Sequence, residues 1–425
     1  MNLVKTEYPA LGERVYEAVT TSGLRVRVVP KPGFAKTYAF LATDYGSIDL
    51  SFTENGVRHV TPMGVAHYLE HKMIDMPDGN AMQMFSRYGG SPNAFTSYDI
   101  TAYYVQCTEN QLENLKLLLE MVFTPYFTEE SVEKEQGIIA QEIRMYADSA
   151  DSCVYENLFA AMYASHPVRH SIAGTVESIG QITAKTLYDC HGAFYTPRNM
   201  MLCVVGDVDP QAVFQVAEDH VKPGKPMAAD REYGEPEVMR PVRSRAEQVM
   251  EVSMPAFALG FKAEPAAYGQ SIMEREIVAE LASEILMGES APLYSRLYTD
   301  NLIDGDFSYG YESVKHVGLL AAAGDSRNPE AVLDAILTEA RRIERDGVDP
   351  ALFERLKRSA IGRWVRALDG FESICYRTCA YAFEGAEYLS FPQAFDTVTP
   401  EQVAAFLKET VQEERAALSV ILPKT

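Results

Sequence analysis

The stretch that decides the fold and the chemistry of this chain is Thr61–Asp75, with the sequence TPMGVAHYLEHKMID. We predict that a helix begins here, because Thr61 is a favourable N-cap residue. His67 and His71 are four residues apart, so they lie on one face of that helix and offer two imidazole ligands for one Zn²⁺. Glu70, next to His71, is placed to take a proton from a water held by the metal.

The same spacing also occurs in helices that bind no metal. A His-x-x-Glu-His string is expected by chance in about 1% of chains of this length and composition. A site with two imidazoles also needs a third ligand, normally a carboxylate or another histidine. The rest of the chain must therefore supply that ligand if the helix holds zinc.

A second predicted helix, residues 128–148, carries a carboxylate that suits this purpose. Its sequence is TEESVEKEQGIIAQEIRMYAD, in which Thr128 can act as the N-cap. Glu135 and Glu142 are seven residues apart and lie on one face. Glu142 sits within the apolar run 138–143, and a half-buried carboxylate needs a cation or strong hydrogen bonds. A zinc ion held by two histidines would provide that cation.

Composition limits the classes of function. The chain has 425 residues, of which 47% are hydrophobic and 23% charged, as in globular proteins of two or more domains. The formal net charge of −22 argues against nucleic acid and anionic membrane surfaces as partners. No run of eighteen apolar residues is present, and the N-terminus has no targeting pattern. Six scattered cysteines without a Cys-x-x-Cys pair favour reduced thiols, so we expect a cytoplasmic protein.

The order of predicted elements indicates an α+β fold with an internal repeat. Thr183–Gly206 and Thr399–Leu422 align without gaps, and each predicts a capped helix, a turn and an apolar strand. We therefore expect two domains of one αβ type, 1–225 and 248–425. Residues 226–247, rich in proline, glycine and charge, are expected to link them.

The second copy is not expected to bind metal. It contains no His-x-x-Glu-His string, and Asp349–Arg366, which echoes the helix of Glu142, offers Arg363 and Trp364 near the ligand position. One Zn²⁺ per chain is therefore the expected stoichiometry.

Taken together, these motifs resemble the pitrilysin-like (M16) zinc peptidases, and in particular their half-length bacterial members. Glu142 follows His71 by 71 residues, which is close to the spacing in that family, and Glu135 and Glu142 form the family's Glu-x6-Glu pair. The family segment Gly-x-x-Asn-Ala-x-Thr is present as Gly90–Thr96. The resemblance covers the first half fully and the second half more weakly. It implies two homologous αβ domains, each a mostly antiparallel sheet packed against helices, which face each other across a chamber.

The resemblance also assigns roles to residues. It implies a zinc-dependent endopeptidase or oligopeptidase, with His67, His71 and Glu142 as zinc ligands and Glu70 as the general base that deprotonates the attacking water. Glu135 is then a second carboxylate close to the site. For the substrate, the resemblance implies that Asn93 and Ala94 present an edge strand, to which an extended peptide adds through its backbone.

One family feature of the second half is incomplete. Members that act alone usually carry an Arg and a Tyr seven residues apart, which contact the substrate near the scissile carbonyl. Here Tyr309 stands at the Tyr position, but Leu302 stands at the Arg position, and Arg296 is not an obvious replacement. We therefore expect this chain to be the zinc-bearing subunit of a pair, either with a second M16-like subunit that carries the Arg/Tyr pair or as a homodimer.

A second class of function stays open. Some chains of this fold have lost their metal and serve as scaffold or processing subunits. The complete set of metal ligands favours the peptidase, whereas the missing Arg keeps the non-catalytic alternative in play for the isolated chain.

Overall fold

The computed structural model describes residues 3–54, 56–224, 229–269 and 271–424. The chain forms two compact units. Unit 1 comprises Met1–Ile143, Ser171–Tyr233 and Val365–Phe383, and unit 2 comprises Arg144–His170, Gly234–Trp364 and Glu384–Thr425. Among the helices of the described residues, none is long and apolar enough to cross a membrane.

Unit 1 is built on a seven-stranded sheet in the order β1-β2-β3-β11-β4-β10-β9. Every neighbouring pair is antiparallel except β11 with β3, which is parallel. The central strands β4 and β11 are buried along their full lengths, as expected for apolar strands covered on both faces. The strands are β1 (Val4–Tyr8), β2 (Glu13–Val19), β3 (Arg25–Pro30), β4 (Thr37–Thr43), β9 (Ser91–Thr96), β10 (Thr101–Cys107) and β11 (Met200–Gly206).

Helices of unit 1 bury their apolar sides in the core of this sheet. They are α1 (Val65–Lys72), α2 (Ala81–Arg87), α3 (Gln111–Phe123), most of α4 (Glu129–Ala147), α6 (Val176–Ile179), α7 (Ala184–Phe194) and α8 (Pro210–His220). Two small sheets complete the unit. Their strands are β5 (Ser51–Glu54), β6 (Val57–Val60) and β12 (Asp230–Glu232), and β7 (Asp75–Met76) with β8 (Gly79–Asn80).

Unit 2 repeats this plan with five strands in the order β13-β17-β14-β16-β15. Here β13 with β17 is the one parallel pair of the sheet, and the others are antiparallel. The strands are β13 (Arg245–Met250), β14 (Ala256–Ala263), β15 (Ser308–Val314), β16 (Val317–Asp325) and β17 (Ala416–Pro423). The helices are α9 (Ser271–Met287), α10 (Pro292–Thr299), α11 (Pro329–Asp346), α12 (Pro350–Ala367), α14 (Phe391–Thr397) and α15 (Pro400–Thr410). The prediction of an α+β fold with mostly antiparallel sheets packed against helices is confirmed.

The internal repeat is visible element by element. Thr183 and Thr399 each close a capping box at the start of α7 and α15, and each helix is followed by a short 3₁₀ turn and the buried strand β11 or β17. The predicted domains, 1–225 and 248–425, were defined by the repeat in the sequence, whereas the two compact units are defined by packing. The domain boundaries stay a prediction.

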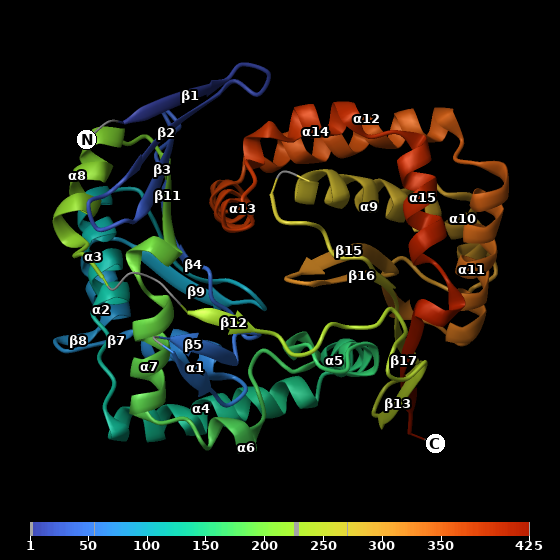
Figure 1. Ribbon diagram of the computed structural model, residues 1–425, viewed down its shortest axis with the longest axis horizontal. Helices are drawn as coiled ribbons and strands as arrows, with labels where there is room; N and C mark the ends of the chain where they lie inside the picture. The colour runs from blue at the N-terminus through green and yellow to red at the C-terminus, as the bar shows by residue number, and fades with distance from the viewer. Residues whose placement is uncertain (1–2, 55, 225–228, 270, 425) are drawn as a thin grey trace. The chain divides into compact units, whose positions relative to one another are not determined.

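The two halves of the chain exchange one helix each (Figure 1). Helix α5 (Ala150–Met162), from the first half, packs on β14 and β17 of unit 2. Helix α13 (Phe371–Phe383), from the second half, packs on β4 and β11 of unit 1. Each sheet is therefore covered in part by the corresponding helix of the other half.

The described part of the connecting segment is anchored by buried charges at two points. In unit 1, Arg231 on β12 contacts Asp44 at 2.9 Å and the fully buried Asp49 at 3.2 Å. In unit 2, the carboxylate of Glu237 accepts hydrogen bonds from the backbone N–H groups of residues 164–166 and from Lys262, whose Nζ lies 3.0 Å away. These backbone and lysine donors outweigh the effect of burial and lower the pKa of Glu237 to about 2.

We expect Glu237→Gln to lower the free energy of unfolding at pH 7 by about 2–3 kcal/mol, because hydrogen bonds to ionised groups are the strong ones. The folded pKa lies below the ordinary value of 4.5, so the stabilisation is complete above about pH 4.5 and is lost as the pH falls toward 2. Urea unfolding of both proteins at pH 7, 5, 4 and 3 measures the difference, which should shrink only at the acidic end. The exposed neighbour Glu235→Gln is the control, and an undiminished difference at pH 3 would contradict the assignment.

Candidate metal centre

Helix α1 begins at Val65, so the prediction of a helix start capped by Thr61 is wrong. Gly64 is the N-cap, with a φ of 87° that favours glycine, and a Cβ there would lie 2.3 Å from the carbonyl oxygen of Ala173. The Thr61 hydroxyl instead donates to the carbonyl of Leu50. Close contact of the backbone with residue 173 therefore sets where the helix starts.

Helices α1 and α4 bring together three side chains of the types that can bind a metal ion. His67 and His71 lie one turn apart on α1, and Glu142 on α4 faces both. Nε2 of His67 lies 3.7 Å from one oxygen of Glu142, and Nε2 of His71 lies 3.5 Å from the other. One donor atom from each residue lies within 4.8 Å of the others, a spacing that can accommodate one ion with two nitrogen ligands and one oxygen ligand.

The pKa values of the two histidines shift in opposite directions. Burial, followed by the positive charge of His71, lowers the pKa of His67 to about 4, so its imidazole is neutral at pH 7. Its Nδ1 atom is buried and has no hydrogen-bond partner among the described residues. Burial alone would lower the pKa of His71, but the hydrogen bond with Glu135 and the charges of the neighbouring glutamates raise it overall. Deprotonation of an imidazole favours metal binding, so the raised pKa of His71 would make such binding at this cluster stronger as the pH rises.

Glu135 orients His71 from the side away from Glu142. Its Oε1 atom lies 3.0 Å from Nδ1 of His71, and this contact lowers the pKa of Glu135 despite partial burial. The carboxylate therefore holds Nδ1 of His71 protonated and leaves Nε2 facing Glu142. A hydrogen bond of this kind fixes the tautomer of a metal-binding imidazole.

Glu70 lies on the same helix and is held from β9. The Thr96 hydroxyl donates to Oε2 of Glu70 at 2.9 Å. Burial raises the pKa of Glu70, and the Thr96 hydrogen bond opposes that rise. Thr96 was not assigned a role from the sequence, although it closes the segment Gly90–Thr96. Its hydrogen bond to Glu70 joins residues 26 positions apart, which a local pattern does not reveal.

Asn93 and Ala94 lie on β9, which pairs with β10 on one side and forms an edge of the sheet. The side-chain oxygen of Asn93 accepts a hydrogen bond from the backbone N–H of Ala94 at 2.9 Å. The edge strand thus satisfies one of its own donors, close to the helix that carries the histidines, since α1 packs against β9.

Tyr309 and its neighbours belong to unit 2. The Tyr309 hydroxyl donates to Oε2 of Glu284 at 3.3 Å, and burial followed by the charge of Glu284 raises its pKa. Arg296 on α10 donates to the buried Glu339 at 2.6 Å. Arg296 is thus engaged by Glu339 on α11. Leu302, at the position where the resemblance predicts an arginine, has no guanidinium group.

The comparisons with known proteins agree with this architecture. Residues 54–176 match the family model described as Insulinase (Peptidase family M16), and residues 181–360 match the one described as Peptidase M16 inactive domain. A Bacillus subtilis protein described as an uncharacterized zinc protease, YmfH, is 38% identical over 99% of both chains.

Solved structures show the same fold. A crystal structure from Alicyclobacillus acidocaldarius, described as an M16-like peptidase, is 33% identical and has a TM-score of 0.94, covering 99% of this chain and 100% of that one. Pitrilysin, at 18% identity and a TM-score of 0.76, matches all of this chain with 47% of its own length.

The fold is thus that of the M16 peptidases, and the Bacillus subtilis relative of this chain is described as a zinc protease. The chain belongs to the M16 family.

We expect Glu135→Gln to weaken Zn²⁺ binding about 10–100-fold, because removing a carboxylate that orients a ligand imidazole has costs of this size. The affinity can be measured by competition with a chromophoric chelator. Glu133→Gln, an exposed acid on the same helix, is the matched control and should leave the affinity unchanged. Equal affinities for the two variants would mean that Glu135 does not support the site.

Proposed function

We propose that this chain is a zinc-dependent endopeptidase or oligopeptidase that hydrolyses extended peptides. The observation that supports it is the convergence of His67, His71 and Glu142, with donor atoms within 4.8 Å of one another and Glu70 on the same helix. Two imidazoles and one carboxylate are a ligand set of catalytic zinc sites, which keep a further position open.

In this proposal the metal and the residues around it have separate roles. Zn²⁺ bound there would supply a Lewis acid that polarises the scissile carbonyl and lowers the pKa of water. Glu70 acts as the general base for the attacking water, and its raised pKa brings it closer to neutral pH, where a base is most effective. Thr96 donates to one oxygen of Glu70 and so keeps that carboxylate in a fixed orientation.

The open edge of β9 suits an extended substrate. In the free protein, the backbone N–H of Ala94 donates to the side chain of Asn93. A peptide that adds to this edge would accept a hydrogen bond from that N–H in place of Asn93. Backbone pairing carries little side-chain information. Selection by extended conformation and size rather than by sequence follows from this mode of binding.

We further propose that the chain works with a second subunit, in the cytoplasm. The guanidinium that the family places before Tyr309 is missing at Leu302, and Arg296 is engaged by Glu339. A heterologous M16-like partner with the Arg/Tyr pair, or a second copy of this chain, would complete the substrate contacts. The six cysteines are all buried and free, in keeping with a reducing compartment.

A non-catalytic scaffold of the same fold is the alternative function. The observation in its favour is the match of residues 181–360 to a domain described as inactive, together with Leu302. That match falls mainly on the half without the ligand cluster.

The test is cleavage of an unstructured, quenched peptide by purified protein with bound zinc quantified, alongside Glu70→Gln. We expect one zinc per chain in both proteins and turnover reduced by at least about 10³-fold in the variant, because the base is lost while the ligands stay. Zinc without turnover in the wild-type protein would favour the partner-dependent form. Protein that takes up no zinc on supplementation would rule out the site and leave the scaffold.

A further inference from the structure

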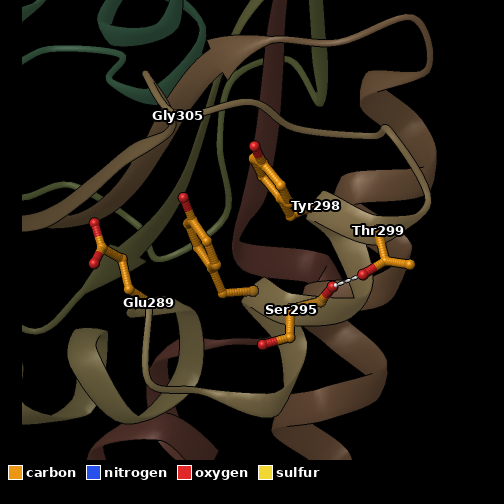
Figure 2. A pocket seen from close by; sticks show the side chains of 6 residues that line it. Glu289, Ser295, Tyr298, Thr299 and Gly305 are labelled. Atoms are coloured by element: carbon orange, nitrogen blue, oxygen red, sulfur yellow. Dashed lines mark hydrogen bonds between the residues drawn. The ribbon is translucent and has the colours of Figure 1, made fainter.

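Unit 2 contains an open pocket of about 520 Å³ (Figure 2). Helix α10 supplies most of its wall. Tyr294 and Tyr298 are one turn apart on this helix, with ring centroids 6.2 Å apart and planes inclined by only 9°. The six lining residues are Glu289, Tyr294, Ser295, Tyr298, Thr299 and Gly305.

The polar groups of the pocket leave one carboxylate free. Ser295 and Thr299 are joined to each other, since the Thr299 hydroxyl donates to the carbonyl of Ser295 at 2.7 Å, as drawn in Figure 2. Glu289 is exposed and takes part in no hydrogen bond or ion pair within the described ranges. Figure 2 shows Glu289 and Tyr298 on opposite sides of the pocket.

The pocket is negatively charged. Its six described lining residues include one acid and no base. Arg296, on the same helix, is directed to Glu339 and does not neutralise Glu289. Burial, followed by the charge of Glu289, raises the pKa of Tyr294, and Asp304 adds to the same effect. The negative charge of Glu289 therefore reaches the phenol of Tyr294. The pocket thus combines one anion with two aromatic rings.

We propose that this pocket binds an alkylammonium or guanidinium cation carried by a peptide. The faces of Tyr294 and Tyr298 attract a cation through their ring quadrupoles, and Glu289 provides an opposite charge at the same site. A single carboxylate is too few ligands for a divalent metal ion, and a neutral ligand would leave its charge unused. The net charge of −22 favours the approach of basic peptides over acidic ones. Only the peptide nature of the ligand rests on the proposed function.

Two sources carry this cation in a peptide: a lysine or arginine side chain, and the N-terminal ammonium group. The test therefore uses fluorescently labelled ten-residue peptides that differ at one position or in the state of the N-terminus. Three are N-acetylated and carry Lys, Arg or norleucine at that position, and a fourth has norleucine with a free N-terminus. Dissociation constants are measured by anisotropy on the full chain with Glu70→Gln, so that no peptide is cleaved.

We expect the cationic peptides to bind about tenfold more tightly than acetylated norleucine, and Glu289→Gln to reduce that preference to about twofold. The affinity for acetylated norleucine should not change. Because Glu289 is exposed, its replacement by Gln removes charge without disturbing the core. Glu354→Gln, an exposed acid on α12 outside the pocket, is the matched control and should keep the full preference.

The four peptides distinguish the two sources of the cation, and each outcome either supports or overturns the proposal. A Glu289-dependent gain with Lys or Arg assigns a side chain, and a Glu289-dependent gain with the free N-terminus assigns the ammonium group. No preference for cations, or a preference that survives Glu289→Gln, overturns the proposal. Because binding is read without turnover, this failure leaves the peptidase assignment untouched, and loss of zinc or turnover in the wild-type chain leaves the pocket result standing.

Discussion

The centre of unit 1 depends on charge compensation between two helices. Three carboxylates, Glu70, Glu135 and Glu142, come close to the two imidazoles of α1. Partly buried anions at this density require positive charge, and they raise the pKa of His71 against the effect of burial. A divalent cation satisfies the requirement without further protons. The carboxylates and imidazoles that face each other from α1 and α4 therefore create an electrostatic environment suited to a cation.

Unit 2 meets the same geometric requirement in a different way. Glu280 and Glu284 lie one turn apart on α9, as the two histidines do on α1, and Arg363 on α12 faces both at 2.8 Å. Trp364 adds a hydrogen bond from its indole nitrogen to Glu280. Helices α9 and α12 are thus joined by an internal guanidinium that compensates two carboxylates.

Local sequence was sufficient for the features that depend on neighbouring residues. The spacing of His67 and His71, the cap at Thr128, whose hydroxyl accepts from Ser131 N–H, and the paired capping boxes at Thr183 and Thr399 were all predictable. Long-range contacts were not. The start of α1 depends on residue 173, and the Thr96 bond to Glu70 depends on strand placement. An amphipathic pattern shows that a helix buries one face, but it does not show which sheet buries it.

The exchange of α5 and α13 has a consequence for how the protein is made. The chain passes between the two units five times, at the unit boundaries after residues 143, 170, 233, 364 and 383. The face of β4 and β11 on which α13 packs is covered by a helix that lies near the end of the chain. This face of the unit 1 sheet can therefore be covered by α13 only after residues 371–383 have been synthesised. A fragment that ends before α13 lacks part of the cover of the unit 1 sheet, and a fragment that begins after α5 lacks part of the cover of the unit 2 sheet.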